Sequence, residues 1–249
     1  MTLSIRALSV GRVFGLPKPS FTYLRGWGAT VDIPLIMFVI EGGDAPVVVD
    51  TGADLSRAWD VHRIKMEQSA DEQPDVALRS AGIDPDDVRL VVNTHLHWDH
   101  SSNNHLFPNA RVVVQQSELD FARKPVMWHR RQFEALPDLS PAWQRAEDRI
   151  SPVDGDTELA PGITLISLPG HTPGSQGVLV EAATRRYLIA GDCVYLYDSW
   201  EGDADADHIP AGIYTDLVAY EESLRKIETL GCEVIPSHDS RVLDRRIFA

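Results

Sequence analysis

The feature that most constrains this chain is a run of polar, metal-binding residue types placed directly after an apolar segment. Residues 88–92 are apolar apart from Arg89 and predict a buried strand. The next eight residues, 93–100, read NTHLHWDH, so three of the chain's nine histidines fall within six positions. Histidine and aspartate are poor choices for the end of a buried strand unless something binds them. We therefore expect a ligand site at this strand end.

The spacing of this motif suits a divalent metal. In an extended segment alternate residues share a face, so His95 and His97 point to one side while the residues next to them point into the core. A turn after Trp98 would bring Asp99 and His100 to the same pocket. Imidazoles with a carboxylate beside them are the donor set of borderline ions such as zinc.

Three further polar residues follow later apolar segments at their carboxyl ends. His171 lies in PGHTPG, Asp192 in AGDCVY and His238 in PSHD. Each alone is interpreted more simply as a loop or turn residue, but functional loops gather at such strand ends in layered α/β folds. The ordered set gives seven ligand-type residues, enough for two ions with one bridging carboxylate. Asp50 either orients one of the ligands or caps a turn.

The remaining histidines lack such a context and are interpreted as ordinary side chains: His62, His105, His129 and His208.

Strand-like and helix-like segments alternate along the chain. Apolar segments predict strands at 3–13, 33–40, 47–49, 88–92, 111–114, 163–167, 177–181, 186–190 and 233–235. Helices are expected at 74–81, 115–123 and 216–230, and a hairpin turn at 42–44. This alternation predicts an α/β layered architecture.

No repeat, low-complexity tract or long linker divides the sequence, so we expect residues 1–249 to form a single domain. The segment 121–150 stands apart, because from residue 124 onward it is rich in Trp, Arg, Phe and Pro and has no clean period. We expect a helical insertion there, either a lid over a pocket or a capping helix pair.

Composition excludes several functional classes. The formal net charge of −14 would repel a polyanion, so a nucleic-acid partner is not expected. The longest apolar run, 33–40, is far shorter than the ~20 residues that span a bilayer, and the first residues do not resemble a secretory signal. With Cys193 and Cys232 as the only cysteines, we expect a cytoplasmic protein with reduced thiols, as a monomer or homodimer.

The motif HLHWDH and the three later ligand-type residues resemble the metallo-β-lactamase superfamily. The likeness extends from VVVDTG at 47–52 to PSHD at 236–239. It implies a four-layer αββα sandwich with two divalent ions at one edge of the facing sheets. The expected ions are zinc, with iron, manganese or cobalt as alternatives. The family pattern would assign His95, His97 and His171 to one ion, Asp99, His100 and His238 to the other, and Asp192 to the bridge.

Within the superfamily the chain is most similar to N-acyl-homoserine lactone lactonases and their relatives, including pyridoxolactone hydrolases. The stretches DIPLIMFVIEGGDAPVVVDTG, VVVQQSELDFA and IPAGIYTDL carry this likeness. Tyr195 matches the tyrosine with which that branch contacts its substrate, although a packed strand-end tyrosine is the alternative. The chain departs from the lactonase pattern at SSNN (101–104), where a glycine pair is common, and at Ser175, where many have a histidine. These departures concern substrate shape and the support of the ligands.

The resemblance implies a hydrolase that opens a lactone ring by attack of a metal-bound hydroxide. Asp99 would orient the attacking water or accept its proton, and Tyr195 would donate a hydrogen bond to the carbonyl or leaving oxygen. The expected substrate is an acyl-homoserine lactone, which would imply quorum quenching, or a small aromatic lactone.

Two alternatives remain open: an ester or thioester hydrolase similar to glyoxalase II, and a metal-dependent ligand-binding relative without turnover. Glyoxalase II usually has a helical C-terminal domain, whereas eleven residues follow His238 here.

Overall fold

The computed structural model describes residues 2–249, within which eight strands form one sheet and five form another. The larger sheet contains β1 (Ser4–Pro17), β2 (Thr30–Glu41), β3 (Val47–Val49), β4 (Lys65–Glu67), β5 (Leu90–Val92), β6 (Arg111–Gln115), β7 (Ile150–Val153) and β13 (Ile247–Phe248). The smaller sheet contains β8 (Thr157–Ala160), β9 (Ile163–Ser167), β10 (Gln176–Glu181), β11 (Arg186–Ile189) and β12 (Glu233–Ile235). The strand order is β13-β1-β2-β3-β5-β6-β7 in the larger sheet, where β4 also pairs with β1, and β12-β11-β10-β9-β8 in the smaller sheet.

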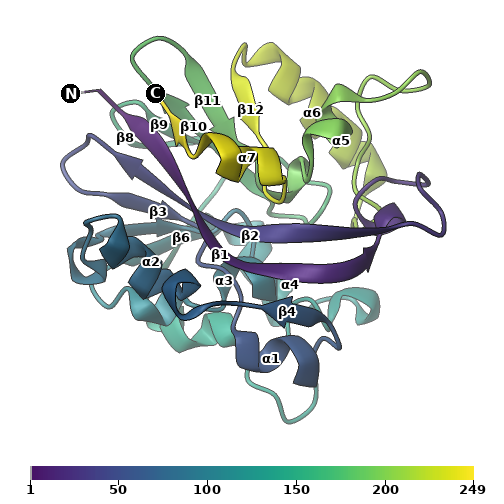
Figure 1. Cartoon of the computed structure of the whole chain (residues 1–249), viewed down its shortest axis with the longest axis horizontal. Coiled ribbons are helices and arrows are strands. Elements are labelled where there is room, and N and C mark those ends of the chain that lie inside the picture. The colour runs from purple at the N-terminus through teal and green to yellow at the C-terminus, as the bar shows by residue number, and fades with distance from the viewer. Residues whose placement is uncertain (1) are drawn as a thin grey trace.

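Helices cover the outer faces of the two sheets. The α-helices are α1 (Leu55–Asp60), α2 (Pro74–Ser80), α3 (Trp98–Ser101), α4 (Gln116–Arg123), α5 (Tyr197–Glu201), α6 (Leu217–Thr229) and α7 (Ser240–Arg245). The 3-10 helices are η1 (Lys18–Ser20), η2 (Ala70–Glu72), η3 (Pro85–Asp87), η4 (Asn104–Leu106), η5 (Met127–His129), η6 (Ala142–Arg149) and η7 (Gly191–Cys193). Figure 1 shows α1, α2 and α4 on the side of the larger sheet and α5 and α6 on the side of the smaller one. The predicted αββα sandwich is confirmed.

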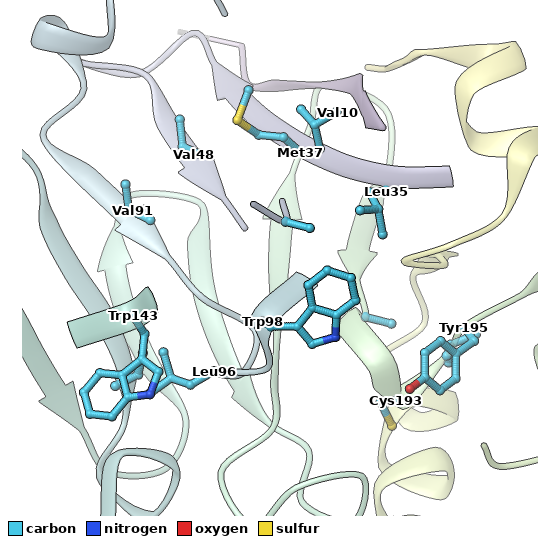
Figure 2. Close-up of a cluster of buried hydrophobic side chains, with 14 of the residues drawn as sticks. Val10, Leu35, Met37, Val48, Val91, Leu96, Trp98, Trp143, Cys193 and Tyr195 are labelled. Atoms are coloured by element: carbon cyan, nitrogen blue, oxygen red, sulfur yellow. The ribbon is translucent and has the colours of Figure 1, made fainter. Parts of the chain in front are cut away.

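The central strands β2, β3 and β6 of the larger sheet are buried on both faces over most of their length, which explains their continuous apolar runs. In β2, Phe38 and Ile40 belong to the cluster between the sheets, whereas the alternate residue Met37 belongs to the cluster on the helix side. Val48 and Val91 join Met37 in that second cluster, part of which Figure 2 shows. The two cores together therefore specify the four layers.

The predicted strands and helices appear with shifts of a few residues at their ends. β1 continues to Pro17 and β2 begins at Thr30, because the two pair along nearly their whole length through two register shifts. The expected turn at 42–44 joins β2 to β3, which pair antiparallel. Short elements such as β4 were missed, because only Met66 of its three residues is buried and its order comes from pairing with β1.

The segment 121–150 has little α-helix beyond the end of α4. It contains η5 and η6 and ends where β7 adds to the larger sheet beside β6. Its role as a lid stays a prediction. No helix within residues 2–249 is both long and apolar enough to cross a membrane.

Candidate metal centre

The residues that follow several strands meet at one edge of the sandwich. In the larger sheet β3 and β5 are parallel neighbours, and they are followed by Asp50 and by the motif 95–100. In the smaller sheet β11 and β12 are parallel neighbours, and they are followed by Asp192 and His238. His171 lies in the loop between β9 and β10. Because the carboxyl ends of parallel neighbours lie at the same edge, the fold gathers these residues.

The motif changes from extended to helical at its middle. His97 is extended (φ −63°, ψ 153°) and immediately precedes α3. Its carbonyl accepts hydrogen bonds from the backbone N–H groups of His100 and Ser101, so the turn begins at Trp98 rather than after it. Leu96 and Trp98 are buried in the core, as expected, and Figure 2 shows both side chains in the helix-side cluster.

All seven side chains predicted as ligands lie together at this edge. They form two groups: His95, His97, His171 and Asp192 in one, and Asp99, His100 and His238 in the other. Within each group the possible ligand atoms lie within 4.8 Å of one another. Asp192 joins the groups, because its Oδ1 lies 3.2 Å from Nε2 of both His100 and His238. Its Oδ2 lies 3.4 Å from Nε2 of His171.

Four of the five histidines direct Nδ1 away from the centre to a hydrogen-bond partner. The partners are Asp50 Oδ2 for His100 (2.7 Å), Ile213 O for His171 (2.8 Å), Pro34 O for His238 (3.0 Å) and Thr94 Oγ1 for His95 (3.2 Å). In neutral rings these contacts place the proton on Nδ1 and leave the lone pair of Nε2 facing the centre.

The nitrogens that face the centre fit a cation. Nε2 of His171 lies 3.2 Å from Nε2 of His95 and 3.1 Å from Nδ1 of His97. Among the described residues, the buried Nε2 atoms of His100 and His238 have no hydrogen-bond partner. Converging lone pairs beside a buried carboxylate are unfavourable unless a cation lies between them. Nitrogen and carboxylate donors without a thiolate suit zinc and similar divalent ions.

The pKa shifts of three of the histidines and of Asp192 agree with such a site. Burial lowers the pKa of His95, His97 and His171, which keeps these rings in the neutral form that binds a metal. Burial disfavours ionisation of Asp192 as well, but the surrounding histidines hold its pKa well below its usual value. Burial also disfavours a charged His100, yet the three neighbouring carboxylates raise the pKa of this ring well above its usual value.

Asp50 combines the two roles considered for it from the sequence. It follows β3 with a φ of 58°, a conformation that aspartate tolerates better than most residues. Its Oδ1 accepts a hydrogen bond from Thr94 N at 2.8 Å, and its Oδ2 lies 2.8 Å from Thr94 Oγ1 and 2.7 Å from His100 Nδ1. Asp50 therefore caps the turn after β5 and also orients a histidine of the motif.

Sequence reasoning missed Glu118, a fully buried carboxylate in α4. Its Oε1 accepts a hydrogen bond from Leu96 N at 2.8 Å, and its Oε2 accepts from Thr172 Oγ1 at 2.6 Å and Gly174 N at 3.2 Å. Glu118 therefore joins the motif loop to the loop of His171. Burial raises the pKa of Glu118 to about 7. Its position on the buried face of a predicted helix was the one available signal.

The departures from the lactonase pattern supply local hydrogen bonds. Ser175 Oγ accepts from Thr172 N at 3.0 Å and lies 2.8 Å from Thr172 Oγ1. Asn103 Nδ2 donates to the carbonyls of Thr51 and Ala53 at 3.0 and 2.9 Å. Both residues stabilise loops that carry or flank the proposed ligands.

A largely apolar cavity of about 310 Å³ opens beside the two groups. Its walls include Val13, Leu16, Phe21, Ile33 and Ile64. Asp99, Asp192 and Tyr195 also line it. The side chain of Asp99 is 19% exposed, more than those of the other six. The ring of Tyr195 stacks on His238 with centroids 5.3 Å apart, and burial raises the pKa of its hydroxyl well above the usual value.

Two of the histidines interpreted as ordinary lie beside this centre. His62 lines the cavity, stacks on Trp98 with ring centroids 4.0 Å apart, and places Nε2 3.3 Å from Glu134 Oε1. The ring of His129 lies 6.1 Å from that of His97 between centroids. His62 therefore packs against the motif at Trp98, and His129 packs beside the predicted ligand His97.

Comparison with known proteins agrees with this geometry. A family model described as the metallo-beta-lactamase superfamily matches residues 36–238. N-acyl homoserine lactonase AttM of Agrobacterium fabrum strain C58 is 32% identical over 240 residues, which cover 86% of this chain and 85% of that protein. An N-acyl homoserine lactonase of Bacillus cereus is 26% identical over 201 residues, which cover 76% of this chain and 74% of that protein.

A solved structure, an N-acyl homoserine lactone hydrolase with the product N-hexanoyl-L-homoserine bound at the catalytic metal center, has the same fold. It aligns with a TM-score of 0.79 and 22% identity over 98% of this chain and 97% of that chain. The family match, the relatives and the shared fold lead to one conclusion: the chain belongs to the metallo-beta-lactamase superfamily, with N-acyl homoserine lactonases among its relatives.

Proposed function

We propose that this protein is a dinuclear-metal hydrolase that opens the ring of an N-acyl homoserine lactone, an activity that would make it a quorum-quenching enzyme. One observation carries the proposal: the two groups of ligand atoms share Asp192 at a largely apolar cavity that Tyr195 also lines. The names of the lactonase relatives support the same activity.

In this proposal two bound divalent ions, with zinc as the first expectation, would supply a water of lowered pKa and a Lewis acid for the substrate carbonyl. The residues that would hold them are His95, His97 and His171 for one ion, Asp99, His100 and His238 for the other, and Asp192 between the two. The outer hydrogen bonds hold four of the five imidazoles in fixed orientations, so little reorganisation of these rings accompanies binding.

Asp99 is proposed to handle the proton of the reaction. Its Oδ2 lies 3.8 Å from Nε2 of His100 and 3.9 Å from Nε2 of His238, and its side chain lines the cavity. A carboxylate that reaches both the centre and the substrate space can accept a proton from the attacking water and return it to the leaving oxygen.

Tyr195 is proposed to stabilise the charge that develops on the substrate. A tyrosine hydroxyl is protonated at neutral pH, and burial raises the pKa of this one further, so it can act as a donor. A donor held beside the reacting carbonyl or the leaving oxygen is typically worth about 10²- to 10³-fold in rate.

The cavity indicates a compact substrate. Its volume of about 310 Å³ lies at the lower end of ordinary ligand sites, which run from about 300 to 1,000 Å³. Its apolar walls suit a short acyl chain or a small aromatic lactone, and a longer chain would extend through the mouth of the cavity.

The test is a pH-release assay on purified protein of known metal content. Short- and long-chain N-acyl homoserine lactones, simple lactones, pyridoxolactone and S-lactoylglutathione form the panel, and His97→Ala is the matched variant. We expect acid release with a short-chain N-acyl homoserine lactone that is lost in His97→Ala. Turnover of the thioester alone, or no turnover by metal-loaded protein, would contradict the proposal.

A further inference from the structure

His97 is oriented differently from the other four histidines of the proposed centre. Its Nδ1 faces the centre, 3.1 Å from Nε2 of His171, whereas the other four rings direct Nδ1 outward. Its Nε2 is buried and has no hydrogen-bond partner within residues 2–249. If the lone pair of Nδ1 is used for a cation, the proton of the neutral ring lies on Nε2. His97 then presents a buried donor that needs an acceptor.

His129 has the complementary property. The residue ends η5, and its ring lies 6.1 Å from that of His97 with 22° between the planes. Nε2 of His129 lies 3.2 Å from Tyr214 O, and because a carbonyl only accepts, Nε2 carries the proton. Nδ1 therefore keeps its lone pair, and this atom is buried without a partner in the described part of the chain. A buried donor and a buried acceptor thus lie on neighbouring rings.

Two phenylalanines that pack against these rings offer no strong hydrogen-bond acceptor. Phe133 lies 4.6 Å from His97 and Phe121 lies 6.0 Å from His129, both edge-on and measured between ring centroids. The two phenylalanines also contact each other at 5.5 Å. This apolar packing restricts how the two imidazoles can satisfy their outer nitrogens, because unpaired buried polar atoms are costly.

The same short loop holds His129 and a second proposed ligand. Ile213 O binds Nδ1 of His171 at 2.8 Å, and the next carbonyl, Tyr214 O, binds Nε2 of His129. His171 in turn contacts His97 across the centre. A link between His129 and His97 would close this set of contacts into a ring around one group of ligands.

We propose that His129 is a positioning residue for His97. Through one bridging water, Nδ1 of His129 accepts the proton on Nε2 of His97 and so holds the tautomer in which Nδ1 of His97 binds the metal. No direct hydrogen bond joins the two nitrogens, whose ring centroids lie 6.1 Å apart, and a single water can bridge polar groups that are too far apart for a direct hydrogen bond. The inference rests on the proposed metal centre. It gives the segment 121–150 a role in supporting that centre, in addition to any role as a cover.

The test compares zinc binding by full-length variants from which metal has been removed. His129→Phe keeps an aromatic ring but removes the acceptor, and His129→Asn keeps an accepting oxygen. His105→Phe is the matched control, because its Nδ1 is also buried and unpartnered but its electrostatic neighbours are Asp54 and Arg145. Competition with a chelator measures the zinc affinity. Long-range ¹H–¹⁵N spectra of the zinc-loaded wild type report the tautomer of His97 directly.

We expect His129→Phe to weaken zinc binding by about 10- to 100-fold, the usual effect of removing an outer partner of a metal-binding histidine. His129→Asn should recover most of this affinity, His105→Phe should match the wild type, and His97 should carry its proton on Nε2. Wild-type affinity in His129→Phe, equal losses in the Phe and Asn variants, or a proton on Nδ1 of His97 would overturn the inference. A wild type that binds no zinc would instead contradict the proposed function.

Discussion

The two sheets contribute to the proposed centre in different ways. The larger sheet supplies four of the seven side chains from one loop, residues 95–100, which Asp50 holds from the neighbouring strand end. The smaller sheet supplies the other three one at a time, after β9, β11 and β12: His171, Asp192 and His238. Local sequence therefore specifies the first set, whereas the second set depends on how three separate strand ends pack. The outer hydrogen-bond partners of the histidines differ likewise. His100 is held by the side chain of Asp50, whereas His171 and His238 bond backbone carbonyls.

Asp192 is where the two contributions meet, so its loss should have the largest effect. Asp192→Asn removes the charge shared by both groups, and we expect lactone hydrolysis to fall by at least about 10³-fold, or about 4 kcal/mol. Steady-state rates and metal analysis should show lower turnover together with lower metal content. Asp87 is an exposed carboxylate, so Asp87→Asn serves as the control and should behave as the wild type. A fully active Asp192→Asn would show that the two groups do not work as one centre.

The contrast between the sheets also explains what the sequence could predict. The arrangement of the motif at 95–100 could be predicted because alternate residues of an extended segment share a face. Only the start of the turn differs from the prediction, since it begins at Trp98 and not after it. The three later side chains were predictable as an ordered set because each follows an apolar segment at its carboxyl end, and the family resemblance then assigned them to the two ions. Glu118 and the contact of His129 with His97 were not predictable, because their partners lie on loops far away in the sequence. β4 was missed for the same reason, since tertiary pairing and not local pattern orders it.

Glu118 links the loops of the two sheets, and its effect should depend on pH. Burial raises its pKa from 4.5 to about 7, so the folded protein keeps this proton over a range in which the unfolded chain has released it. The stability that protonated Glu118 contributes is therefore complete below pH 4.5 and is lost as the pH rises to about 7. The difference amounts to about 3 kcal/mol in the free energy of unfolding.

Urea unfolding of metal-free protein at several pH values measures this effect. Between pH 4.5 and 7 the wild type should lose stability relative to Glu118→Gln, which cannot titrate at this position. Stability curves that stay parallel over this range would mean that Glu118 has an ordinary pKa.

A variant of Tyr195 distinguishes an effect on the reaction rate from an effect on metal binding. Because Tyr195→Phe removes only a hydroxyl, we expect kcat to fall by about 10²-fold while the metal content stays at the wild-type value. Rates on one lactone and metal analysis of the same sample test this. An unchanged kcat would return Tyr195 to the role of a packed aromatic residue.

A variant of Asp50 tests whether the motif loop, residues 95–100, depends on this one side chain. Asp50→Asn weakens the outer hydrogen bond of His100, and we expect metal affinity to fall by about 10- to 100-fold. Competition with a chelator measures this loss, and Asp87→Asn again serves as the control. An affinity equal to that of the wild type would show that the motif loop is ordered without Asp50.

We propose above all that the seven side chains hold two ions that act together on a lactone. Stepwise addition of zinc to metal-free protein, with bound metal and hydrolysis of a short-chain N-acyl homoserine lactone measured at each step, tests it most directly. We expect no turnover in the metal-free protein and a maximum when two ions are bound per chain. Full activity without metal, or a maximum at one ion that a second leaves unchanged, would contradict it.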